Sequence, residues 1–521
     1  MRTFSATVIL IASCCTFLAG TSSAAAQSSS HDKKEEPNSP VFKGYKPPDE
    51  LPLLGPSDEA YQAWMAFNAA LKAGSGDVLA QHELGIRYLL GRGVEKDTVK
   101  AAYWIRKAAE QNLVPARFNL GILEYYGWGE PWNPFGAFRD FEYCAEQNMA
   151  EAQFIMGEFY TENLIVPQDF QKAYMWVKKA VDAGYKPAAE VLRELDKRIA
   201  KKDSSSPTPA SVAPVFLDVP EDTLSSASEW TVLKSALRDA GPELSAALGL
   251  SRMLDGTLDV DSLSFQSIEL AAERGSPEAL SVLARCYEKG IMVRKDLVQA
   301  AVQYIRAIRM DSPRSTQLLW KMMQEKGFLQ EMKRRAREGD PAAEFAWAGL
   351  AALGFDAYLT QGQAVITGDE ALRFLKNAAA KKYAQAFVEL GLCAYSGRWV
   401  PRDIRQAKEF WNAAAALGNK EAEVRLAIVA VRDMDTAEDV SGPIATLTRS
   451  SGEGSILAEV ALGYCYETGR GLPRNVSEAA RLYSNGARRG SQDAYRALRR
   501  MLDAIRPTES EFRIDDFALQ Q

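Results

Sequence analysis

A 36-residue period constrains this chain more than any other feature of its sequence. Alanine recurs at this step near the N-terminus, at Ala80, Ala116, Ala152 and Ala188. The same step returns near the C-terminus, at Ala386, Ala422, Ala458 and Ala494. A fixed period of this size predicts an α-solenoid, in which each two-helix repeat buries its apolar face against its neighbours.

The residues within one period predict a helix, a glycine turn and a second helix. Ala80 and Leu84 share one helical stripe. Gly85 lies inside that helix at a cost of about 1 kcal/mol relative to alanine, so its recurrence predicts a closely approaching partner helix. Gly91 ends the helix, and Asp97 is placed to cap the next one. Residues able to cap recur at equivalent steps: Asn133, Asp169, Asp261, Asp296, Asp403, Asp439 and Asn475.

This pattern resembles the SEL-one-like repeat family, which is related to tetratricopeptide repeats. The matching motifs are A-x-x-x-L-G-x-x-Y over Ala80–Tyr88, G-x-G-V over Gly91–Val94, and A-x-x-W-x-x-x-A-A from Ala101. A second clear copy runs from Gly463 to Gly490. The resemblance implies an all-α superhelical solenoid of about ten two-helix repeats in two arrays. It also implies a protein that binds other proteins or peptides and has no catalytic activity.

Composition and repeat phase together predict six segments. They are a signal peptide (1–26), a disordered tether (27–56), an N-terminal repeat array (57–200), a flexible linker (201–222), a C-terminal repeat array (223–506) and a loose tail (507–521). The signal peptide is predicted from Arg2, the apolar run Val8–Ala19 and the small residues Ala24–Ala26. Lipid attachment at Cys14 is an alternative. No later stretch is long and apolar enough to predict a membrane span in the mature chain.

The C-terminal array departs from the regular period. Its repeats are phased on Leu244, Ala279, Ser315, Ala343, Ala386, Ala422 and Ala458. The short step from Ser315 to Ala343 predicts a repeat that has lost its turn. The long step from Ala343 to Ala386 predicts an insertion around Leu359–Val365, and lengthened turns in a solenoid often lie on the binding face.

The sequence offers few residues for catalysis or metal binding. There are two histidines: His31 lies in the predicted tether, and His82 stands alone on a helix. This excludes most zinc, Ser-His-Asp and Cys-His sites. We expect no catalytic residue, metal or cofactor. A carboxylate-dependent hydrolase is the remaining enzymatic alternative, because the pairing of carboxylates in space is invisible in sequence. The net charge of −6 gives no argument for a nucleic-acid partner.

Four cysteines follow the predicted signal peptide: Cys144, Cys286, Cys393 and Cys465. The last three occupy the same repeat phase, so they are stacked along the solenoid. Equivalent residues of different repeats are too far apart for a disulfide. We therefore predict four free, buried thiols.

One turn carries an unusual number of aromatic residues. Where other turns are short and polar, this one contains Tyr125, Tyr126, Trp128 and Trp132. Two interpretations are open: packing against the neighbouring repeat, or a platform for a partner. These four residues, with Trp399 in a similar turn, are the candidate partner-binding residues.

These observations favour an exported adaptor or scaffold that binds proteins or peptides in the bacterial cell envelope, either periplasmic or secreted. A eukaryotic endoplasmic-reticulum adaptor is a rival setting. A cell-wall glycan-binding module that uses the aromatic turn is an alternative of a different class, and the hydrolase is a third.

Overall fold

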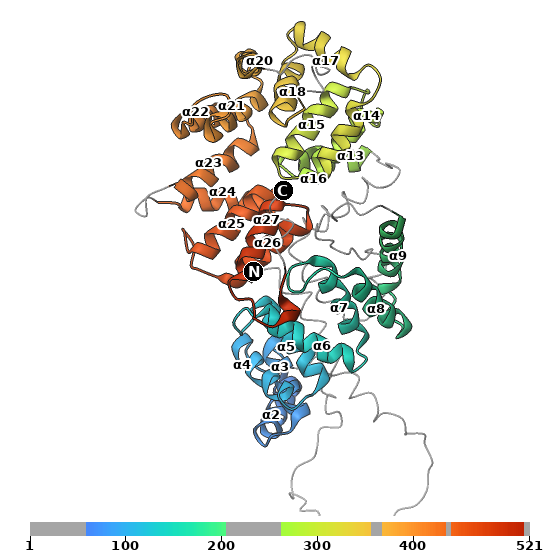
Figure 1. The fold of residues 1–521 in the computed structure, drawn as a ribbon. Helices are drawn as coiled ribbons and strands as arrows, with labels where there is room; N and C mark the ends of the chain where they lie inside the picture. The colour runs from blue at the N-terminus through green and yellow to red at the C-terminus, as the bar shows by residue number, and fades with distance from the viewer. Residues whose placement is uncertain (1–58, 205–261, 356–366, 434–438, 515–521) are drawn as a thin grey trace, which may run out of the picture. The chain divides into compact units, whose positions relative to one another are not determined.

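The computed structural model describes residues 59–204, 262–355, 367–433 and 439–514, and within these ranges every regular element is a helix (Figure 1). Contacts divide the chain into two units. One takes in residues up to Ser235 together with those from Pro507 onward, and the other runs from Ala236 to Arg506. The predicted signal peptide and tether, most of the predicted linker and the insertion at 359–365 lie outside the described residues.

The N-terminal unit is a succession of helices, each packed on the one before and the one after. They are α2 (Glu59–Gly74), α3 (Val78–Leu90), α4 (Thr98–Ala109), α5 (Val114–Tyr126), α6 (Pro134–Glu146), α7 (Ala150–Glu162), α8 (Phe170–Asp182) and α9 (Ala188–Ser204). Because α9 continues to Ser204, the predicted boundary between array and linker at residue 200 falls inside a helix.

The C-terminal unit contains the remaining α-helices. They are α13 (Ser262–Glu273), α14 (Pro277–Lys289), α15 (Leu297–Arg309), α16 (Pro313–Met323), α17 (Phe328–Arg337), α18 (Pro341–Ala352), α20 (Gly368–Ala380), α21 (Ala384–Ser396), α22 (Ile404–Ala416), α23 (Lys420–Asp433), α24 (Ser441–Gly452), α25 (Ile456–Thr468), α26 (Val476–Arg488) and α27 (Gln492–Asp503). An α/α solenoid is thus confirmed. No helix among the described residues combines the length and apolarity of a membrane span.

Capping residues close the turn between the two helices of a repeat. The Asp97 carboxylate accepts a hydrogen bond from the Lys100 amide at 2.9 Å, and the Asp97 amide donates to the Tyr88 carbonyl at 3.0 Å. The predicted caps at Asn133, Asp169, Asp296, Asp403 and Asn475 are likewise confirmed. Asp439 differs: it accepts from the Ser441 amide, but it lies one residue before the N-cap of α24. Asp261 is outside the described residues.

The recurrent helix glycines lie where two helices approach closely. A Cβ atom on Gly85 would be 2.6 Å from Cγ1 of Ile105 and 3.0 Å from the Ala101 carbonyl oxygen. At the equivalent Gly121, a Cβ atom would be 3.0 Å from the Phe141 ring. The close approach offsets the low helix propensity of glycine, as the sequence predicted.

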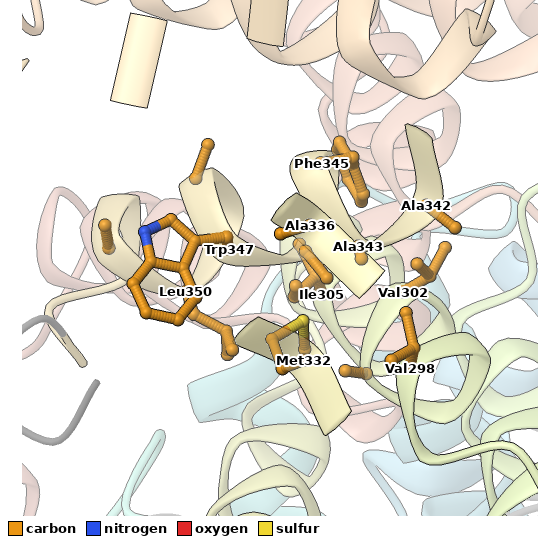
Figure 2. Packing of buried hydrophobic residues seen from close by; sticks show 14 of the residues in the cluster. Val298, Val302, Ile305, Met332, Ala336, Ala342, Ala343, Phe345, Trp347 and Leu350 are labelled. Atoms are coloured by element: carbon orange, nitrogen blue, oxygen red, sulfur yellow. The ribbon is translucent and has the colours of Figure 1, made fainter. Parts of the chain in front are cut away.

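The shortened repeat of the C-terminal unit keeps a turn, which corrects the expectation that the turn is lost. Helices α16 and α17 are joined by residues 324–327. Helix α17 then packs against α15 and α18, where Met332 joins Ile305 and Leu350 in one buried cluster (Figure 2). Burial of these side chains fixes the short repeat in the solenoid in place of the standard motif.

The first and last repeats of the C-terminal unit contact each other directly. The Arg489 guanidinium donates to the Glu278 carboxylate at 2.9 and 3.0 Å and lies 3.4 Å from the Glu459 carboxylate. The Ser491 hydroxyl donates to the Asp311 carboxylate. These groups are 180 and 211 residues apart in sequence, so the C-terminal unit closes on itself.

The four cysteines that follow the predicted signal peptide are free and buried, as predicted. Burial raises the pKa of Cys144 and Cys393 to about 12, and that of Cys286 and Cys465 to about 11. The thiolate is the nucleophilic form, so these thiols are unreactive at neutral pH.

Candidate protein-interaction surfaces

The aromatic turn between α5 and α6 packs largely against its own solenoid. Tyr126 is buried and its ring stacks on Trp128, with centroids 4.7 Å apart and an interplanar angle of 19°. Trp128 is half-buried against the core of the preceding repeat. Tyr125 lies 6.0 Å from the Phe159 ring of α7. These three side chains therefore join consecutive repeats, and Trp132 is partly buried.

A partly buried ionic network lies beside this turn, and sequence analysis did not identify it. Arg106 of α4 donates to the Glu130 and Glu124 carboxylates, at 2.9 Å in each case. Asn133 also donates to Glu124, at 3.3 Å. Burial raises the pKa of Glu124, and Arg106 opposes that shift. The network connects α4 to both ends of the turn and helps to fix its conformation.

Trp399 belongs to the C-terminal unit, whereas the other four candidates belong to the N-terminal unit. Its backbone is in the left-handed region, with φ of +62°, where Gly129 and Gly471 stand in the equivalent turns. That conformation costs a residue other than glycine about 1–3 kcal/mol. The indole packs against the start of α20, where a Cβ atom on Gly368 would lie 2.7 Å from its Cδ1 atom. This packing offsets the strain.

Two buried titratable groups of the N-terminal unit, His82 and Asp140, have strongly shifted pKa values. Burial lowers the pKa of His82 to about 4, and its Nε2 atom is 2.8 Å from the Asn119 side-chain amide. Burial raises the pKa of Asp140 to about 7, with Arg117 at 3.9 Å opposing the shift. Acid–base catalysis needs several such groups converging on one position. No cluster of three or more potential metal ligands occurs in the described ranges.

A small cavity lies within the C-terminal unit. It has a volume of about 160 Å³, and its lining includes Asp311, Tyr395, Trp411 and Arg425. Sites for small organic ligands usually measure about 300–1,000 Å³. The cavity is therefore too small for a typical small-molecule ligand, and its Asp311 already accepts a hydrogen bond from Ser491.

The C-terminal segment packs onto α6 of the N-terminal unit, which sequence analysis did not predict. Residues 507–514 were expected to be part of a loose tail. Instead Ser510–Phe512 form a short 3₁₀ helix beside α6, dark red in Figure 1, and the Phe512 side chain is fully buried. Its ring makes edge contacts with Phe135 and Phe138, at centroid distances of 5.2 and 5.5 Å. Residues 515–521 lie outside the described part.

The paired helices, their glycine contacts and the capped second helices define an α/α repeat protein. Comparison with family models gives the specific class. The Sel1 repeat model matches residues 78–113, 114–139, 150–185, 277–312, 384–419 and 456–491. The chain is thus a Sel1 repeat protein, which confirms the family indicated by its motifs. The repeats phased on Ser315, Ala343 and Ala422 are not among the matched segments, although they too form helices.

The chain is similar to two curated mammalian proteins over part of its length. They are the DAP3-binding cell death enhancer 1 of Rattus norvegicus and that of Mus musculus. Each is 26% identical to this chain, over 26% of this chain and 34% of the relative. The chain thus matches about a third of the length of these relatives.

Two solved structures are similar to the chain. One is a protective antigen present in uropathogenic Escherichia coli strains that displays an SLR fold. It is 21% identical to this chain, the match covers 86% of this chain and 98% of that protein, and the TM-score is 0.29. The other is a Sel1 repeat protein from Oxalobacter formigenes. It is 34% identical to this chain, the match covers 25% of this chain and 96% of that protein, and the TM-score is 0.24. These TM-scores are too low to support a structural argument.

Proposed function

We propose that this chain is a non-catalytic scaffold that binds protein or peptide partners in the bacterial cell envelope. The observation that carries the proposal is the segment docked on α6: a short stretch of chain inserts Phe512 between solenoid side chains and pairs Glu509 with Arg139 at 2.5 Å. A surface that holds one such segment has the chemistry to hold another. The name of the mammalian relatives, which describes binding to DAP3, agrees with this class of function.

The proposed location rests on the N-terminal sequence. The basic residue, apolar run and small residues of segment 1–26 support export, either to the periplasm or to the medium, with a lipoprotein attached at Cys14 as the alternative. The proposed lack of catalysis is supported by the unreactive buried thiols and by the burial of His82, which lowers its pKa to about 4.

The test is capture of partners by the full chain starting at residue 27, immobilised and exposed to a bacterial envelope extract, with binding to purified peptidoglycan measured in parallel. We expect a protein to be retained specifically and peptidoglycan to be left in solution. Retention of peptidoglycan without any protein would replace the proposal with the glycan-binding alternative.

Two tryptophan variants show whether the aromatic turn takes part in capture. Both tryptophans are partly buried, and Trp128 packs against the core of the preceding repeat. Trp132→Ala should weaken capture and leave thermal unfolding nearly unchanged. Trp128→Ala should lower the unfolding temperature. If Trp132→Ala captures the partner as well as the unchanged chain does, the turn is only a packing element.

A further inference from the structure

One face of α6 presents a stripe of side chains to the C-terminal segment. Phe135, Phe138, Arg139 and Glu142 follow the i, i+3, i+4, i+7 spacing that places residues on one helix face. Phe512 contacts the first two of these. Arg139 pairs with Glu509, and its guanidinium also lies 5.4 Å from the centre of the Phe512 ring. The stripe therefore provides an aromatic pocket with a cation beside it.

The C-terminal segment fits this face imperfectly. The negative charge of Glu511 acts on Glu142 at the end of the stripe and on Tyr160 of α7. Burial is the main cause of the raised pKa of Glu142, and the like charge of Glu511 adds to it. Burial also raises the pKa of Tyr160 to about 12, and the charges of Glu142 and Glu511 add to that shift. Glu146 adds to the negative charge around Glu142, while Lys172 and Arg139 oppose it. The segment thus combines one ionic contact, between Glu509 and Arg139, with an unfavourable like charge near Glu142.

We propose that this α6 face is a peptide-binding site, that residues 509–512 of the chain occupy it as an internal ligand, and that the partner is a protein segment with the same phenylalanine and upstream carboxylate. The carboxylate that the partner keeps is at the position of Glu509. At the position of Glu511, immediately before the phenylalanine, the partner has a neutral or basic residue. This inference rests on the proposed function, since it names the chemistry of the partner and the place where it binds.

Tethering explains how an imperfect segment keeps its place. A segment on the same chain has an effective concentration of the order of millimolar, which compensates for a weak intrinsic affinity. A partner segment that lacks the repulsive carboxylate gains affinity at the same site and displaces the internal ligand. The site is therefore selective for partners that bind better than the chain binds itself.

The experiment uses the full chain from residue 27 and a fluorescein-labelled peptide of residues 507–514, with binding followed by fluorescence anisotropy. Two hosts are compared, the unchanged chain and Phe512→Ala, in which the internal ligand has lost its anchor. We expect the peptide to bind the Phe512→Ala host at least about tenfold more tightly, because its site is no longer occupied. The matched control is the labelled peptide with its own phenylalanine changed, Phe512→Ala, and this peptide should not bind.

Charge variants of the same peptide test the detailed fit. Glu511→Gln in the peptide should tighten binding to the Phe512→Ala host by about two- to fivefold, as expected for a partly exposed charge contact. Adding Arg139→Glu to that host should weaken binding of the unchanged peptide. A Glu509→Lys peptide should recover binding to this doubly substituted host, which a merely misfolded host would not show.

Three results would overturn the inference: equal peptide binding by the two hosts, no binding to Phe512→Ala at millimolar peptide, or binding that persists when the peptide lacks the phenylalanine. The proposed function fails separately. If the peptide binds as expected but neither host retains any envelope protein, the site exists and the scaffold function is wrong. If a captured protein is not displaced by the peptide, the scaffold function stands and this site is not where the partner binds.

Discussion

Both units are built from the same type of two-helix repeat, but different contacts hold the repeats of each unit together. In the N-terminal unit, a polar contact such as that between His82 and Asn119 joins adjacent repeats. In the C-terminal unit, Arg489 also joins the last repeat to Glu278 in the first complete one. The comparison teaches that the motif specifies the helix pair and its capping. Closure of a solenoid on itself depends instead on side chains outside the motif.

The largest expected effect comes from breaking the closure of the C-terminal unit. Arg489→Ala leaves the buried carboxylates of Glu278 and Glu459 without their cation, so the C-terminal unit should lose about 3–5 kcal/mol of unfolding free energy. The measurement is hydrogen exchange resolved to the peptides of each unit. Protection should fall in α14 and α25–α27 and remain unchanged in α3–α8.

The matched variant in the N-terminal unit is Arg106→Ala. The Arg106 side chain is 38% exposed and bridges neighbouring elements, so its loss should destabilise that unit less and more locally. Equal losses of protection from the two arginine variants would show that contact between the first and last repeats adds nothing to the stability of the C-terminal unit.

The second effect is a pH dependence carried by His82, which the C-terminal unit cannot share because its sequence has no histidine. The pKa of His82 falls from 6.5 to about 4 on folding, so between these values only the unfolded chain binds the proton. Stability contributed by the neutral histidine is complete above pH 6.5 and is lost as pH falls toward 4. The loss amounts to about 3 kcal/mol.

Asp140 changes the stability of the same unit in the opposite direction. Burial raises its pKa from 3.8 to about 7, so the folded state takes up a proton first and gains stability as pH falls through this range. The unchanged chain therefore shows the sum of two opposed effects. The informative measurement is the unfolding free energy of the N-terminal unit in His82→Gln and in the unchanged chain between pH 4 and 7. The difference between them should change with pH; parallel curves would contradict the assignment to His82.

The third effect tests the close helix approach that both units share. Gly121→Val places new atoms against the Phe141 ring, which is already 3.0 Å from the position of a Cβ atom. Overpacking of this kind should cost about 1–3 kcal/mol. The control is Gly74→Val, since a Cβ atom there would meet nothing within 4 Å. Thermal unfolding that responds equally to both would mean that the helix contact at Gly121 is loose.

Sequence analysis predicted those features that repeat along the chain. Gly85, Asp97 and most of their equivalents could be identified because the same residue types recur at one step, and the structure gives Gly85 and Asp97 the expected contacts. The same reasoning identified the aromatic turn, but periodicity alone could not show that Tyr126 is buried, since burial depends on the neighbouring repeat.

The features that sequence analysis missed occur once in the chain. Arg489 stands at the end of a helix, where a basic residue usually faces solvent, and its partner Glu278 is 211 residues away. Phe512 lies between Glu511 and Arg513 outside the repeats, where no periodic signal marks it as buried. Both contacts depend on the path of the solenoid through space, which a local pattern does not determine.

The smallest expected effect concerns the helix caps and refines the comparison between units. Asn475 caps α26 by accepting a hydrogen bond from the Glu478 amide at 3.1 Å, and Asn475→Ala should cost about 1 kcal/mol. Its counterpart is Asn133→Ala, which removes the cap of α6 and also a donor to the buried Glu124.

In a solenoid whose repeats contact only their neighbours, the lost stability stays close to the changed repeat. The Asn133 variant should therefore exchange faster in α5–α7 only. In the closed unit, α26 leads directly to Arg489, so the Asn475 variant should loosen the first repeat as well. We expect faster exchange in α14 of the Asn475 variant and no matching change in α3 of the Asn133 variant. Purely local effects in both would mean that the contact between the first and last repeats does not transmit stability.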